Sequence, residues 1–129
     1  MSSEMQPKMS GRDYRVFLFG EESVEAHLKG PTATLAPWLT EMSDRMLFED
    51  VWQRDGLAVR DRSLVTIAGL TAIGRANELR AHLRAARGLG ITQEELINAI
   101  VQLAFYAGLP PIHAALAVAQ EVFAEEDEG

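Results

Sequence analysis

Residues 62–100 read RSLVTIAGLTAIGRANELRAHLRAARGLGITQEELINAI, and this stretch decides the fold. Its apolar side chains recur every three or four positions, as they do on one face of an α-helix. Gly74 interrupts the first helical segment, and the glycine-rich turn at 88–90 ends the second. Thr92 with Glu95 forms a capping box, the clearest helix start in the chain. The stretch therefore predicts three consecutive helices joined by short turns.

The flanking segments follow the same helical pattern. Prolines at 37 and at 110–111 lie where helices begin, and residues 10–29 favour helix over a short strand at 16–19. No convincing alternating strand pattern appears. We therefore expect an all-α fold, a single-domain helical bundle of about five to seven helices. The expected parts are a disordered N-terminus at 1–9, the domain at 10–124 and an acidic tail at 125–129.

Composition narrows the function classes. The chain has 129 residues and a net charge of −7, and four of its 19 acidic residues lie in the last five positions. A general nucleic-acid binder needs a basic face, which this balance disfavours. There is no cysteine, so disulfides, thiolate metal sites and cysteine nucleophiles are excluded. No signal peptide or apolar run of about 20 residues appears, so we expect a cytoplasmic protein without a membrane partner.

Two helical segments are apolar around more than one narrow face. They span residues 96–107 and 112–123. A domain of this size has little interior in which to bury broad apolar faces. The pattern therefore predicts a homo-oligomer.

Several motifs occur in an order that resembles the carboxymuconolactone decarboxylase family, within residues 48–116. The motifs are W-x-R-x-GL at 52–57, RSLVTIA at 62–68, EL-x-x-H at 78–82, LGIT-x-EE at 89–95 and YAG-x-P at 106–110. The resemblance implies an all-helical subunit of the alkyl hydroperoxidase D-like superfamily, assembled as a trimer or hexamer. It also implies a cofactor-independent enzyme that decarboxylates a carboxylated muconolactone in aromatic catabolism.

A second branch of the superfamily uses a C-x-x-C pair followed three residues later by His. If His82 is the matching histidine, the cysteines would fall at positions 75 and 78, where this chain has Arg75 and Glu78. A dithiol peroxidase is therefore disfavoured.

Two different functions stay open beside decarboxylation. His113, three residues after the YAG-x-P motif, suggests a related lyase, isomerase or cyclase of secondary metabolism. The chain could also be a non-catalytic oligomeric binding protein.

Three residues are the candidates for acid–base catalysis. Decarboxylation without a cofactor requires a proton donor for the carbanion, and histidine suits this task because its pKa lies near working pH. His82 is the first candidate, Glu78 one helical turn earlier can orient it, and His113 is a possible second acid or base. By itself the Glu78–His82 spacing is also typical of a simple surface pair. The histidines form no local metal-binding motif, so no metal site is expected.

Four further residues are candidates for substrate binding. Arg60 and Arg62 could each hold a carboxylate through paired hydrogen bonds, although structural ion pairs are a simpler interpretation. Trp52 and Tyr106 could form the wall of an apolar pocket, although core positions are a simpler interpretation for both, as for Trp38.

Overall fold

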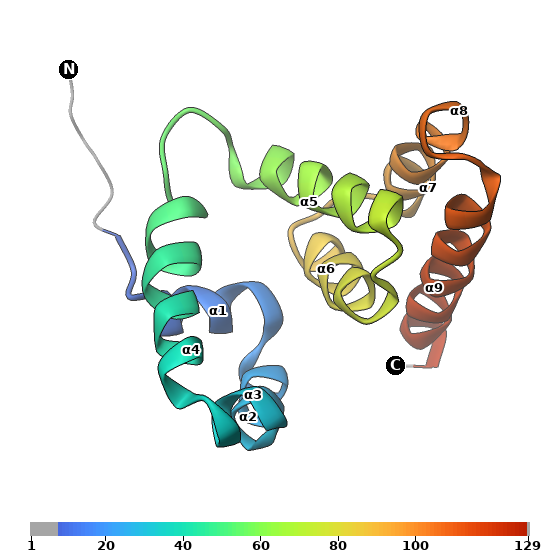
Figure 1. The fold of residues 1–129 in the computed structure, drawn as a ribbon. Helices are drawn as coiled ribbons and strands as arrows, with labels where there is room; N and C mark the ends of the chain where they lie inside the picture. Colours follow the sequence, from blue (N-terminus) through green and yellow to red (C-terminus); the bar gives the residue numbers. More distant parts are fainter. Residues whose placement is uncertain (1–7, 129) are drawn as a thin grey trace. The chain divides into compact units, whose positions relative to one another are not determined.

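The computed structural model describes residues 8–128, which contain nine α-helices and one π-helix and no strand (Figure 1). The all-α prediction is confirmed. There are more elements than the expected five to seven, because short helices occupy segments that were predicted as turns or as parts of longer helices. The chain divides into two compact units, Met1–Leu57 and Ala58–Gly129, and each is described by itself. Residues 1–7, in the segment predicted to be disordered, lie outside the described residues.

Five helical elements make up the described part of the first unit. They are α1 (Gly11–Phe19), α2 (Glu21–Lys29), α3 (Pro31–Leu35), α4 (Pro37–Met42) and the π-helix η1 (Ser43–Val51). Ser10 caps α1, since its hydroxyl accepts a hydrogen bond from the backbone N–H of Asp13 at 3.1 Å. The short helix α3 was not predicted. Helices α1 and η1 pack against each other.

A buried ion pair joins α1 to η1. The Nε atom of Arg15 donates to one oxygen of Asp44 at 2.7 Å, and the Nε atom of Arg12 donates to the other oxygen at 2.9 Å. Arg15 and Asp44 are each only 8% exposed, and the guanidinium of Arg15 lies 4.5 Å from the ring centroid of Phe48. The two helices approach closely because Gly11 has no side chain. A Cβ atom there would lie 1.7 Å from the carbonyl oxygen of Asp44.

The second unit contains α5 (Val59–Ile73), α6 (Ala76–Gly88), α7 (Gln93–Val101), α8 (Ala104–Ala107) and α9 (Leu109–Glu128). Helix α5 begins at Val59, before the stretch 62–100 from which it was predicted. Its N-cap is Ala58, and Asp61 lies in its first turn. Gly74 ends α5 in a left-handed conformation, with φ of 74°. The predicted capping box of α7 is confirmed, with Thr92 and Glu95 exchanging hydrogen bonds of 2.9 and 3.0 Å.

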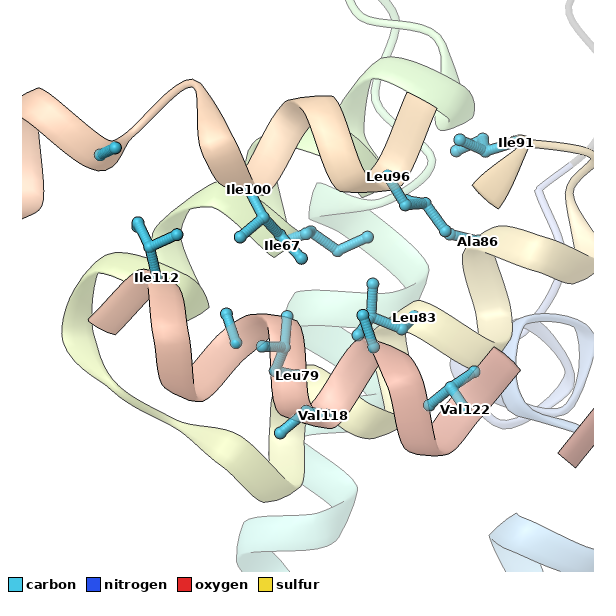
Figure 2. Packing of buried hydrophobic residues seen from close by; sticks show 13 residues of the cluster. Ile67, Leu79, Leu83, Ala86, Ile91, Leu96, Ile100, Ile112, Val118 and Val122 are labelled. Carbon is cyan, nitrogen blue, oxygen red and sulfur yellow. The ribbon is translucent and has the colours of Figure 1, made fainter. Parts of the chain in front are cut away.

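The core of this unit forms where α6 packs against α5 and α9, while α7 packs on the same two helices. Figure 2 shows the buried side chains of these helices, and of the turn between α6 and α7, pointing toward one another. Those labelled in the figure are Ile67, Leu79, Leu83, Ala86, Ile91, Leu96, Ile100, Ile112, Val118 and Val122. Because Leu79, Leu83 and Ala86 recur at helical spacing, one face of α6 is fixed by this packing, and its other faces are free for polar residues.

Three ion pairs join α6 to α9 along their length. Arg80 contacts Glu121 at 2.9 Å, Arg84 contacts Glu125 at 2.6 Å, and Arg87 contacts Glu126 at 2.8 Å. We call these six side chains the α6–α9 ion-pair ladder. The segment predicted as a solvated acidic tail therefore continues α9 as far as Glu128, and two of its carboxylates are paired with arginines.

Within residues 8–128, no helix combines the length and the apolar character that crossing a lipid bilayer requires.

Candidate functional site

Helix α6 carries the two central candidates on neighbouring turns. Glu78 is exposed in the first turn, and His82 is half-buried beside the packed side chains of Leu79 and Leu83. Burial lowers the pKa of His82 to about 4, because desolvation penalises the charged ring, while the negative charge of Glu78 acts in the opposite direction. The imidazole is therefore neutral near pH 7, and a negative group brought close to it would favour its protonation.

The two candidate arginines lie in the first turn of α5. Arg60 is exposed and forms an ion pair with Glu95 at the start of α7, a partner that sequence reasoning did not consider. Arg62 is half-buried, and its helix packs directly against α6. Arg60 is therefore engaged in a structural ion pair. Arg62 lies on α5, the helix that packs beside the one carrying His82.

The remaining candidates come from separate elements. His113 is exposed near the start of α9. Tyr106 on α8 is 83% exposed and Trp38 on α4 is 60% exposed, so the core interpretation is wrong for both in the single chain. Trp52 is 6% exposed and belongs to the first unit, where its ring lies 6.4 Å from that of Tyr14. The core interpretation therefore holds for Trp52.

The third histidine also has a structural setting. His27 lies on α2 in the first unit, with its Nε2 atom 3.3 Å from the hydroxyl of Thr40. Burial and the positive charge of Arg15 lower the pKa of His27.

In the described part of the chain, no three His, Asp or Glu side chains gather closely enough to hold a metal ion.

Sequence reasoning missed several buried polar groups. The pair Arg15–Asp44 is an example: its members lie far apart in the sequence, and nothing local to either shows the contact. In the second unit, Ser63 and Thr71 are each 1% exposed, and their hydroxyls have no hydrogen-bond partner among the described residues. A signal did exist for these two, because both hydroxyls fall on the inward stripe of α5, where aliphatic side chains are usual.

Residues 37–121 match the carboxymuconolactone decarboxylase family. This match spans most of the chain and includes Glu78, His82 and His113. The chain belongs to this family. The resemblance drawn from the ordered motifs is therefore confirmed, and the helical fold agrees with it.

Relatives of this family member include two named decarboxylases. The chain is 41% identical to a 4-carboxymuconolactone decarboxylase of Acinetobacter baylyi, over 95% of its own length and 90% of the relative's. It is 32% identical to a nitrosuccinic acid decarboxylase of Metarhizium robertsii, over 86% and 77% of the two chains. It is also 38% identical to an uncharacterised 15.0 kDa protein of Paracoccus denitrificans, over 73% and 72%. These similarities support a decarboxylase-like role for this family member.

Proposed function

We propose that the protein is a cytoplasmic, cofactor-independent decarboxylase of a small carboxylated or lactone-type acid, with His82 as the proton donor to carbon. The observation that carries the proposal is the half-buried His82, with its lowered pKa and Glu78 one turn away, inside the segment that matches the family. Two relatives with different acids in their names support decarboxylation as the type of reaction. A role in aromatic catabolism follows if the substrate is 4-carboxymuconolactone.

The proposed reaction breaks one carbon–carbon bond and forms one carbon–hydrogen bond. The electron pair of the bond to the carboxylate carbon moves into a neighbouring carbonyl of the substrate as CO₂ leaves, which gives an enolate. Protonated His82 then gives its proton to the carbon, and the ring takes up another proton from solvent when the next substrate carboxylate binds. One proton is consumed for each CO₂ released, so the step balances without an added oxidant or reductant.

The low pKa of His82 is compatible with this role because the substrate is an anion. In the free protein, burial keeps the ring neutral. A substrate carboxylate beside the ring would raise the pKa of His82 and draw in a proton, and Glu78 would add to this effect. The proton would then be present on His82 only when substrate is bound.

Arg62 is the proposed carboxylate ligand, because it lies half-buried on the helix that packs against α6. Its guanidinium could form two parallel hydrogen bonds with a carboxylate. His113 as a second acid or base, and Arg60, Trp52 and Tyr106 as substrate-binding residues, stay predictions. Of these, Arg60 would first have to leave Glu95.

A homo-oligomer, as a trimer or hexamer, is part of the proposal. Large apolar side chains are exposed on α8 and α5: Phe105 is 94% exposed, Tyr106 83%, Ile73 67% and Val65 63%. Apolar groups with this exposure are more stable when a second copy of the chain covers them. Such a contact would also bury Tyr106 and bring it into a site shared between subunits.

The test is CO₂ release from 4-carboxymuconolactone and from nitrosuccinic acid by the purified protein, with no cofactor added and a chelator present. The proposal expects catalysed release from a small carboxylated acid of this kind, with one solvent deuterium incorporated into the product carbon in D₂O. Conversion of the acid without loss of CO₂ would instead indicate an isomerase or cyclase. Absence of any turnover, with saturable binding of the acid, would support a binding protein.

A further inference from the structure

A small pocket opens at the turn between α5 and α6 and faces α9. About 230 Å³ of empty space, which includes open solvent, lies among the residues around it. Its wall includes Leu70, Thr71, Arg75, Leu79, Ala115 and Val118. Glu78 and His82 are not among the residues that line it. The pocket is therefore separate from the pair proposed for catalysis.

Thr71 brings an unsatisfied hydroxyl to the wall of this pocket. The residue is 1% exposed, and its Oγ1 atom has no hydrogen-bond partner among residues 8–128. Thr66, on the same helix, shows how a helical threonine usually satisfies its hydroxyl: it donates to the backbone carbonyl of Arg62 at 2.8 Å. A buried hydroxyl without a partner is costly, so a polar group that reached Oγ1 of Thr71 from the pocket would stabilise the protein.

Arg75 supplies a positive charge at the same place. It is exposed at the N-cap of α6, and within residues 8–128 its side chain forms no hydrogen bond or ion pair. No side chain caps this helix start, so the first backbone N–H groups of α6 add to the positive potential. Glu78 lies in the same turn but is exposed and takes no part in the pocket wall.

We infer that this pocket binds the carboxylate of a small aliphatic acid, with Arg75 and the hydroxyl of Thr71 as its polar ligands. The apolar remainder of the acid packs on Leu79 and Val118, which Figure 2 shows close together on α6 and α9. The lining sets the class of ligand. The side chains of Arg75 and Thr71 are the polar ones in an otherwise apolar wall, which suits an acid with a short aliphatic chain.

The site does not depend on the proposed decarboxylation, because none of its residues has a role in that reaction. It lies at the start of the helix that carries His82, so an acid bound there would contact the same element as the catalytic pair. A small acid could therefore occupy it while a substrate is bound elsewhere on α6.

The test is an NMR titration of the full-length protein with butyrate, using the uncharged butyramide as the matched ligand. The expected result is saturable shifts of the backbone amides at 70–79 and 111–118 with butyrate and much weaker ones with butyramide. The variants Arg75→Gln and Thr71→Val should each weaken butyrate binding by at least about tenfold, the loss of one good charged or buried polar contact.

Matched variants test whether a loss of butyrate binding is specific to this pocket. Thr66→Val removes a hydroxyl that is already satisfied, and Arg45→Gln removes an exposed arginine elsewhere in the chain, so both should bind butyrate like the unaltered protein. His82→Gln should abolish CO₂ release and leave butyrate binding unchanged. The inference is overturned if butyramide binds as tightly as butyrate, if no saturable shifts appear, or if Arg75→Gln and Arg45→Gln behave alike.

Discussion

The imidazole of His82 links stability to pH because its pKa differs between the folded and unfolded chain. Burial lowers the pKa from 6.5 to about 4 in the folded protein. Between these values the unfolded chain takes up a proton that the folded protein does not, so stability decreases as the pH falls through this window. Above the window both states are neutral, and His82 contributes no pH dependence.

We therefore predict that His82→Gln flattens the pH dependence of stability between pH 6.5 and about 4. The full effect is at most about 3 kcal/mol, from the conversion of the pKa difference into free energy. It is measured by urea unfolding at several pH values. His113→Gln is the control, because His113 is exposed. An unchanged pH dependence in His82→Gln would show that the ring is not buried in solution.

The hydroxyl of Thr71 destabilises the protein in the absence of a ligand. Valine has nearly the same shape without the polar atom, so Thr71→Val should raise the free energy of unfolding by about 1 kcal/mol. Thr66→Val should give no gain, because that hydroxyl donates to the carbonyl of Arg62. Chemical denaturation of both variants checks this prediction, and a destabilised Thr71→Val variant would mean that the hydroxyl already has a partner.

Gly11 is required by the close contact of α1 with η1. A Cβ atom at this position would lie 1.7 Å from the carbonyl oxygen of Asp44, so Gly11→Ala should force the helices apart and weaken the Arg15–Asp44 pair. We expect a loss of more than about 2 kcal/mol. Gly69→Ala is the control, because nothing lies within 4 Å of a Cβ atom at Gly69. Equal stability of the two variants in urea would contradict the packing.

At the scale of elements, α9 is held on α6 by apolar packing and by the ion-pair ladder. The pairing with Arg84 and Arg87 lowers the pKa values of Glu125 and Glu126. Both carboxylates are exposed, so salt should screen these pairs. We predict that the double variant Glu125→Gln, Glu126→Gln speeds amide hydrogen exchange in the last turns of α9, measured at low salt.

The control for the ladder is Glu128→Gln, which removes an exposed charge from the same helix without breaking one of the ladder's pairs. Its exchange should match that of the unaltered protein. High salt should reduce the difference between the double variant and the unaltered protein. Exchange that is equally slow in all three at low salt would mean that apolar packing alone holds the end of α9.

Local signals made most of the helices predictable. The boundaries of α6 follow from Gly74 and the turn after Gly88, and the start of α7 follows from the Thr92 capping box. The short helix α3 and the early start of α5 were not predicted. Both depend on backbone conformations that many sequences can adopt, and Ala58 carries no side-chain signal as an N-cap.

Long-range pairing limited what sequence could show about the site. Glu78 and His82 could be placed together because they share a helix. The partner of Arg60 is Glu95, 35 positions away, and the ladder joins residues about 40 positions apart. The identity of such partners depends on how helices pack, which periodicity does not specify. The exposure of Tyr106 was missed for the same reason.

At the scale of the whole molecule, the exposed apolar side chains predict self-association. Phe105→Glu would place a charge in the proposed contact between copies, and it changes a residue that is 94% exposed in the single chain. We expect the unaltered protein to have the mass of a trimer or hexamer by light scattering, and the variant to shift toward smaller species without loss of helix. A monomeric unaltered protein would contradict the prediction.

The most direct test of the central claim is the rate of CO₂ release by His82→Gln relative to the unaltered protein, with His27→Gln as control. The measurement uses whichever small carboxylated acid the unaltered protein decarboxylates. If His82 delivers the proton to carbon, the variant should lose roughly 10²- to 10⁴-fold in kcat, the usual contribution of a positioned acid, while His27→Gln keeps its rate. Equal rates for all three proteins would contradict the assignment of His82.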